Sequence, residues 1–138
     1  MKIDDVKKAK EIMYPVGYSV YFLTDESGEI VYVGESARSA VQRISSHAYT
    51  KEYSRVFFIP CKTKEEMDIL EATMIIAASP KYKRRIDNPA VLGLVGVTEL
   101  KRMGHRTGAI INAVNDHKIK TVQVGTNSYF EKRIVDLI

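Results

Sequence analysis

The sequence predicts an α+β fold in which strands and helices follow the order β-β-α-β-α, with a smaller helical region at the C-terminal end. Two runs rich in aromatic and β-branched residues, 18–24 and 29–34, flank a turn sequence and therefore predict a hairpin. A third run of this kind covers residues 54–60. Residues 63–78 carry apolar side chains at helical spacing, which predicts a long helix after the third strand.

Shorter elements lie on either side of the hairpin. The charged residues 3–13 are expected to form a short helix. Ser39 and Gln42 have the spacing of a capping box, so a helix should start there and turn Val41 and Ile44 inward.

The long helix has signals at both of its ends. Thr63 and Glu66 form a second capping box at its start, and Pro80 ends it. Asn88 followed by Pro89 indicates a boundary, because proline is tolerated in the first turn of a following helix. We therefore expect two units, residues 1–88 and residues 89–138.

The chain is mildly basic, with a net charge of +4 and a pI near 9.1, which is compatible with a nucleic-acid partner. The net charge is +1 over residues 1–89 and +3 over residues 90–138. Four basic residues lie close together between these parts, and they form either a solvated linker or a strip that contacts phosphates. They are Lys81, Lys83, Arg84 and Arg85.

The composition excludes several classes of protein. Hydrophobic residues make up 45% and charged residues 28% of the chain, which is typical of a folded protein and not of a disordered one. A single cysteine, Cys61, forms neither an internal disulfide nor a cysteine-rich zinc site. No apolar run is long enough to cross a bilayer, and no apolar signal core follows the N-terminus. We expect a cytoplasmic protein without a membrane partner.

Three polar residues stand out in the first 90 positions. Arg43 and His47 lie four residues apart, so they project from one face of the same predicted helix. Glu71 lies in the apolar stripe of the long helix, between Met67 and Met74. A carboxylate in that position costs free energy unless it is paired with a basic residue or binds a metal, and both alternatives stay open.

Two tyrosines of the hairpin complete a familiar arrangement. Tyr21 ends the tripeptide Ser-Val-Tyr, and Tyr32 begins the tripeptide Tyr-Val-Gly after ten intervening residues, although strand tyrosines often serve packing alone. Together with Arg43, His47 and Glu71, this order and spacing over about residues 15–85 resembles the GIY-YIG nuclease superfamily. That superfamily includes homing endonucleases, restriction enzymes and the nuclease subunit of nucleotide-excision repair.

The resemblance implies a small three-stranded antiparallel sheet flanked by helices and a metal-dependent cleavage of phosphodiester bonds. Glu71 would bind Mg²⁺ or Mn²⁺, hard cations that prefer oxygen ligands. Arg43 would stabilise charge on the phosphate. Tyr21 would activate or position the attacking water, Tyr32 would orient the phosphate or the nucleophile, and His47 would hydrogen-bond a tyrosine or the water. Which tyrosine is the base stays open.

Two positions depart from the pattern of the superfamily. Ser19 replaces the first glycine of the hairpin motif, which we expect to be tolerated because serine is small. Lys83 stands where an asparagine usually follows the glutamate helix. A lysine at that position could still contact a phosphate as a point charge.

The C-terminal region has the pattern of a helix, a glycine turn and a second helix over residues 97–115, followed by a hairpin over residues 120–130. We expect the first helix at residues 99–103, capped by Thr98, and a last helix at residues 131–138. The pattern resembles excisionase-like or MerR-like winged helix-turn-helix modules. The alternative is a plain helical subdomain that closes the core.

The helix-turn-helix interpretation would place residues 106–115 of the second helix, which is expected over residues 106–117, in the major groove of DNA. Six polar or basic residues of this region are the candidates for contacts with bases and phosphates. They are Arg106, Thr107, Asn112, Asn115, Lys118 and Lys120.

These patterns favour a DNA endonuclease of the homing, restriction or phage type that acts on double-stranded DNA. A cut through both strands would need a homodimer or two successive nicks. Two alternatives remain. Lys83 favours a DNA-binding regulator that has lost nuclease activity, and the superfamily also includes repair-type nucleases that need partner subunits.

Overall fold

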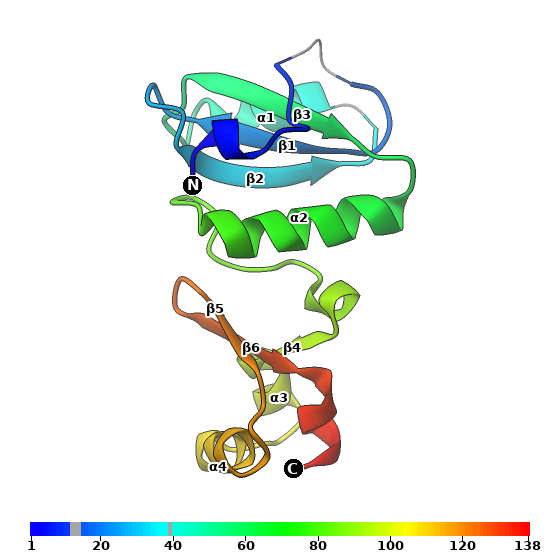
Figure 1. Cartoon of the computed structure of the whole chain (residues 1–138), viewed down its shortest axis with the longest axis vertical. Coiled ribbons are helices and arrows are strands. Elements are labelled where there is room, and N and C mark those ends of the chain that lie inside the picture. Colours follow the sequence, from blue (N-terminus) through cyan, green and yellow to red (C-terminus); the bar gives the residue numbers. More distant parts are fainter. Residues whose placement is uncertain (12–14, 39) are drawn as a thin grey trace.

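The computed structural model describes residues 1–11, 15–38 and 40–138. Helices and strands are labelled in chain order (Figure 1). The strands are β1 (Ser19–Thr24), β2 (Ile30–Ser36), β3 (Arg55–Pro60), β4 (Leu94–Gly96), β5 (Thr121–Val124) and β6 (Asn127–Glu131). The α-helices are α1 (Ala40–His47), α2 (Lys64–Ala78), α3 (Val97–Arg102) and α4 (Thr107–His117). Three short 3₁₀ helices are η1 (Ile3–Asp5), η2 (Pro89–Leu92) and η3 (Lys132–Asp136).

The first sheet is antiparallel with the strand order β2-β1-β3, which confirms the α+β class and the three-stranded sheet flanked by helices. Every residue of the central strand β1 is buried. Its side chains alternate between two core clusters, as a pleated strand requires. Val20 and Phe22 pack with residues of α2, whereas Tyr21 and Leu23 pack with residues of α1.

Helix α2 lies between this sheet and residues 89–138, which are called the C-terminal part below (Figure 1). Its residues Met74 and Ile75 share one core cluster with β1 and β2 and also with Val124 and Tyr129 of the C-terminal part. A helix covered on two sides needs apolar residues around most of its circumference. This explains why the apolar pattern of residues 63–78 is so continuous.

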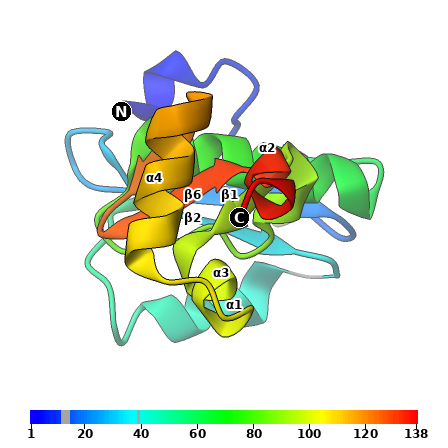
Figure 2. The same cartoon turned by 90° about the horizontal axis from the view of Figure 1, so that it is seen from below.

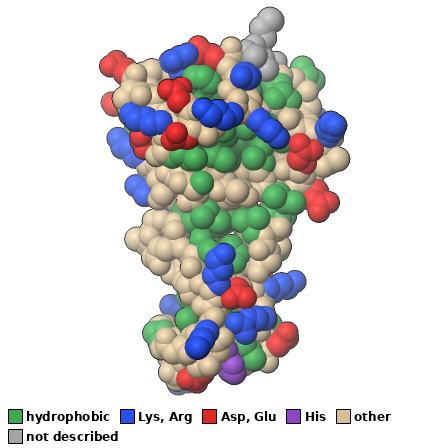
Figure 3. Space-filling view, in the orientation of Figure 1, with side chains coloured by type: hydrophobic (Ala, Val, Ile, Leu, Met, Phe, Trp, Pro, Cys, Tyr) green, Lys and Arg blue, Asp and Glu red, His purple; other side chains and the backbone are tan. Residues whose placement is uncertain are grey.

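The C-terminal part has its own antiparallel sheet, with the order β4-β6-β5, and its own core cluster. The buried side chains of α3 and α4, among them Leu100 and Ile110, pack there against Phe130 of β6. Helices α1 and α3 lie on the same side of the molecule (Figures 1 and 2). The opposite side carries basic and acidic side chains in a mixture, with hydrophobic side chains grouped near the middle (Figure 3).

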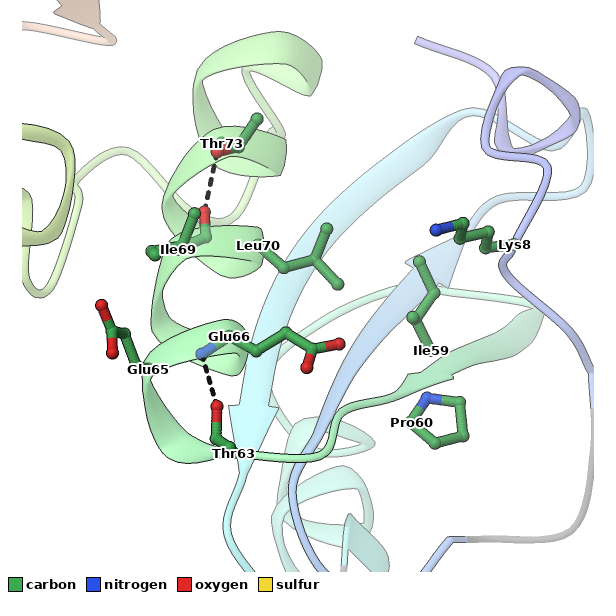
Figure 4. A pocket seen from close by; sticks show the side chains of 9 residues that line it. All are labelled: Lys8, Ile59, Pro60, Thr63, Glu65, Glu66, Ile69, Leu70 and Thr73. Carbon is green, nitrogen blue, oxygen red and sulfur yellow. Dashed lines mark hydrogen bonds between the residues drawn. The ribbon is translucent and has the colours of Figure 1, made fainter.

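The predicted Thr63 cap at the start of α2 is confirmed, but the reciprocal hydrogen bond of the capping box reaches the residue before the cap and not the cap itself. The Glu66 amide donates to Thr63 Oγ1 at 3.1 Å, and the Glu66 carboxylate accepts from the Lys62 amide at 3.4 Å. The same helix borders a groove lined by Ile59, Leu70 and others, which includes none of the site residues that the sequence predicts (Figure 4). Within the part of the chain that the structure describes, no helix is long and apolar enough to span a membrane.

Two expectations for the N-terminal half are wrong. The short helix expected at residues 3–13 is only the 3₁₀ turn η1, and Lys10 instead forms a β-bridge with Phe58. The end of that expected helix, and the Ser39 cap of α1, lie outside the described residues. In α1, Ile44 is buried as expected, but Val41 is 43% exposed, because the buried stripe of the helix runs through Ala40 and Ile44 and Val41 lies at the edge of this stripe.

The C-terminal half differs from its prediction in three places. The short strand β4 was not predicted, because three residues are too few to show a period. Helix α3 begins at Val97 with Gly96 as its cap, so Thr98 is not the cap. The segment expected to form a last helix at residues 131–138 is the end of β6 followed by η3.

Ser19, which replaces the first glycine of the hairpin motif, has a measurable effect on stability. Ser19 is completely buried, and its Oγ has no hydrogen-bond partner among the described residues. We expect Ser19→Ala to raise the free energy of unfolding by about 1 kcal/mol, because it removes an unsatisfied buried hydroxyl. Chemical denaturation would measure the change, and a less stable variant would contradict the prediction.

Candidate active site

Tyr21 lies in the middle of β1 and is completely buried. In the antiparallel register it pairs with Gly34 of β2, and the end of its ring lies beside that glycine. A Cβ atom at position 34 would lie 2.5 Å from both Cζ and Oη of Tyr21, which is far inside normal packing distance. The glycine of the second tripeptide therefore leaves room for the tyrosine of the first.

Gly34→Ala is expected to lower the free energy of unfolding by about 1–3 kcal/mol, because the added methyl group overpacks the core around Tyr21. Denaturant unfolding would measure the loss. In a Tyr21→Leu background, whose side chain lacks the far end of the ring, the same methyl group should cost much less. Equal losses in both backgrounds would show that the clash is not with Tyr21.

The Tyr21 hydroxyl is hydrogen-bonded to His47 at the end of α1. The distance from Tyr21 Oη to His47 Nε2 is 2.8 Å, and Lys51 Nζ lies 3.1 Å from His47 Nδ1. An ammonium group only donates, so Nδ1 accepts, and the proton of the neutral ring is on Nε2 and is donated to Tyr21 Oη. Burial, followed by the charges of Lys51, Arg43 and Lys83, lowers the pKa of His47 to about 4.

Tyr32 lies beside this hydrogen-bonded pair. Its ring centroid is 4.6 Å from that of His47 and 6.0 Å from that of Tyr21. Two ammonium groups lie over the Tyr32 ring, with Lys51 Nζ 4.8 Å and Lys83 Nζ 5.7 Å from its centroid. Positive charge is thus concentrated where the two tyrosines meet.

Arg43 lies on the exposed side of α1, one turn before His47. Its charge lowers the pKa of Tyr21, which burial raises well above its ordinary value. Burial is the larger of the two effects, so Tyr21 is a protonated phenol in this structure.

Glu71 of α2 is 3% exposed. Burial, and then the charge of Glu35, raises the pKa of Glu71 to about 8, while Lys83 opposes this shift. Among the described residues no salt bridge to Glu71 is found, and Lys83 Nζ instead pairs with Asp87 at 2.7 Å. The buried ion pair that the sequence left as an alternative is therefore absent from the described part of the chain.

A divalent cation suits the position of Glu71. The described residues hold no group of three or more His, Cys, Asp or Glu side chains that could enclose a metal. A cation at Glu71 would therefore be held by one carboxylate together with water and phosphate oxygens, which is a common mode for Mg²⁺. Its charge would favour the ionised carboxylate that burial disfavours.

The basic residues between α2 and β4 differ in their exposure. Lys81 and Arg85 are exposed, and the Arg85 side chain lies 3.4 Å from Asp87. Lys83 points inward toward Tyr32, with 14% of its side chain exposed. Arg84 is exposed, and its Nε donates to the Lys81 carbonyl at 3.2 Å.

The polar residues predicted on the second helix of the C-terminal part all have exposed side chains on α4 or near its ends. Lys118 ends the helix in a left-handed conformation with φ of 51°, and the Lys120 amide donates to the Glu131 carboxylate. The exposed set is Arg106, Thr107, Asn112, Asn115, Lys118 and Lys120.

Two residues of this site were not predicted from the sequence. Lys51 lies four residues after His47, so continuing the spacing that relates Arg43 to His47 would have found it. Glu35 follows Gly34 directly, and burial, with Asp68 beside it, raises the pKa of Glu35 to about 7. A carboxylate at the end of a buried strand carries no signal by itself.

No family model matches this chain. Among curated proteins the chain is similar to the UvrABC system protein C of Desulfatibacillum aliphaticivorans, with 37% identity over 78 residues. Part of this chain therefore resembles UvrC. The alignment covers 48% of this chain and 13% of that relative, so the chain spans a small share of the relative's length.

Solved structures of the GIY-YIG N-terminal endonuclease domain of UvrC from Thermotoga maritima are also similar. The form bound to magnesium has 25% identity and a TM-score of 0.44, covering 60% of this chain and 99% of that chain. A point mutant bound to its catalytic divalent cation has 26% identity and a TM-score of 0.45, covering 62% of this chain and 100% of that chain.

Proposed function

We propose that this protein is a GIY-YIG-type endonuclease that hydrolyses phosphodiester bonds in double-stranded DNA with the help of Mg²⁺ or Mn²⁺. The observation that carries the proposal is the meeting of Tyr21, Tyr32 and His47 around a hydrogen-bonded, positively charged centre, with a buried carboxylate at Glu71. The sequence similarity to UvrC supports it.

In the proposed reaction, a cation held by Glu71 would polarise the phosphate and neutralise charge on the leaving oxygen. The Tyr21 phenol first loses its proton to solvent, and His47 Nε2–H stabilises the phenolate by donating to it. The phenolate then takes a proton from the attacking water and returns to the neutral phenol. Arg43 pairs with the non-bridging phosphate oxygens, and Tyr32 orients the nucleophile. Because Tyr21 has no exposed surface, substrate binding must open a path to its hydroxyl.

We further propose that residues 89–138 form a helix-turn-helix-like module that targets the nuclease to DNA. Helix α4 would enter the major groove and present Arg106, Thr107, Asn112 and Asn115 to the bases, with Lys118 and Lys120 near the backbone.

The test is the conversion of supercoiled plasmid to relaxed DNA by the purified protein with and without Mg²⁺. We expect metal-dependent relaxation, with linear product only when two copies act on opposite strands. Binding of DNA without cleavage in Mg²⁺ or Mn²⁺ would overturn the proposal. It would favour a DNA-binding regulator without nuclease activity, the alternative suggested by Lys83 at the position where the superfamily usually has asparagine.

A second candidate is a repair-type nuclease that needs partner subunits. The similarity to protein C of the UvrABC system favours this candidate. Cleavage of naked plasmid by the chain alone would weigh against it, whereas cleavage that appears only with partner proteins would establish it.

A further inference from the structure

The hairpin formed by β5 and β6 contacts the segment that carries Lys83. In Figure 1 the hairpin points toward the loop that follows α2. Asn127 Nδ2 donates to the Arg84 carbonyl at 2.5 Å, and the Ile86 amide donates to Tyr129 Oη at 2.8 Å. Ile86 and Tyr129 are 4% and 6% exposed, so the second hydrogen bond is made away from water. Its loss would leave a buried amide without a partner.

The turn of the hairpin fits closely against the same segment. Gly125 has φ of +59°, and a Cβ atom there would lie 3.0 Å from Cβ and Cδ of Arg84. A glycine is therefore needed both for the turn and for the close approach. The aliphatic part of Arg84 packs against the turn, so this basic side chain has a structural partner within the protein.

Lys83 is thus held between two anchored points. On its N-terminal side the Tyr82 amide donates to the Val31 carbonyl of β2 at 2.9 Å. On its C-terminal side Arg84 and Ile86 are bonded to the hairpin. The Lys83 ammonium is also ion-paired with Asp87 at 2.7 Å, one residue after Ile86, so fixing the backbone of this segment helps to keep the ammonium near Tyr32.

We propose that Tyr129 and Asn127 are positioning residues that act on the active site through Lys83. In this proposal the C-terminal part holds Lys83 in its place in the active site, in addition to contacting DNA. The inference rests on the proposed nuclease function. A purely structural role of the hairpin is the competing explanation, and it predicts effects that do not depend on Lys83.

The first experiment does not require cleavage activity. Lys83 in the full chain is acetylated with an N-hydroxysuccinimide ester, and its rate of modification is followed by mass spectrometry. We expect Tyr129→Phe and Asn127→Ala each to raise this rate by about threefold or more, because a released segment exposes the ammonium. Thr121→Ala, an exposed position on the same hairpin, is the control and should leave the rate unchanged. Unchanged modification of Lys83 in both variants would overturn the proposal.

The second experiment measures cleavage with saturating DNA in a double-mutant cycle. Tyr129→Phe should slow the cleavage step by about tenfold in the wild-type background but by less than about twofold in a Lys83→Met background. The affinity for DNA should be unchanged, because α4 is untouched. Equal slowing in both backgrounds would show that the hairpin acts without Lys83 and would overturn the proposal. If the wild-type protein does not cut DNA, the proposed function fails and the labelling result alone decides the positioning role.

Discussion

Glu71→Gln is expected to slow Mg²⁺-dependent cleavage of plasmid DNA by roughly 10³-fold or more, while the protein still folds and binds DNA. The amide has the same shape as the carboxylic acid but lacks the charge that would hold the cation. Glu65→Gln, at an exposed position on the same helix, is the matched control and should keep full activity. Initial rates measured over a range of Mg²⁺ concentrations would test this. Undiminished cleavage by Glu71→Gln would remove this residue from the metal site.

The same variant should change how stability depends on pH in the presence of EDTA. The folded protein raises the pKa of Glu71 to about 8 from an ordinary value of 4.5. The native state therefore binds this proton more tightly than the unfolded chain. The resulting stability is complete below about pH 4.5 and is lost as the pH rises through about 8. Between pH 5 and 9 the melting temperature of the wild type should fall by more than that of Glu71→Gln. Equal falls in melting temperature would contradict the raised pKa of Glu71.

Tyr21→Phe is expected to slow cleavage by about 10²–10⁴-fold, the usual contribution of a positioned general base. Burial raises the pKa of Tyr21 well above its ordinary value, so only a small fraction is phenolate at neutral pH. The wild-type rate should therefore rise about tenfold per pH unit between pH 6 and 9. His47, with a pKa of about 4, contributes no inflection in that range.

Tyr32→Phe provides the comparison for this prediction. Tyr32→Phe should lower the cleavage rate, but the rate should still increase with pH. In Tyr21→Phe the cleavage rate should no longer increase with pH. The reverse pattern would assign the base to Tyr32. Single-turnover rates at saturating Mg²⁺ would measure both profiles without interference from product release.

Local signals explain why the first sheet and α2 could be predicted from the sequence. The hairpin has a turn between two β-rich runs, and α2 has a capping box and a long apolar period. The polar residues of the site could be found because their spacing follows these regular elements. Arg43 and His47 are one helical turn apart, and Tyr21 lies in the strand beside Gly34.

The features that were missed depend on contacts between distant parts of the chain. The strand β4 exists because it pairs with β6, more than thirty residues later. The bridge between Lys10 and Phe58 replaces part of the helix expected near the N-terminus. The pairing of Asn127 and Tyr129 with residues 84–86 likewise has no periodic signature in the sequence. Tertiary contacts of this kind override local preference.

The double coverage of α2 limits how this chain can acquire new DNA specificity. Ile76 of α2 lines a pocket with Leu92 and Val122 of the C-terminal part, and Met74 belongs to the core cluster that includes Val124. Replacing the whole C-terminal part by an unrelated DNA-binding domain would expose the apolar residues on this side of the helix to solvent. An exposed apolar patch of this kind promotes aggregation. Recombination at the boundary near residue 88 is therefore disfavoured. Substitution of the exposed residues of α4 leaves the shared core intact and is the easier evolutionary route.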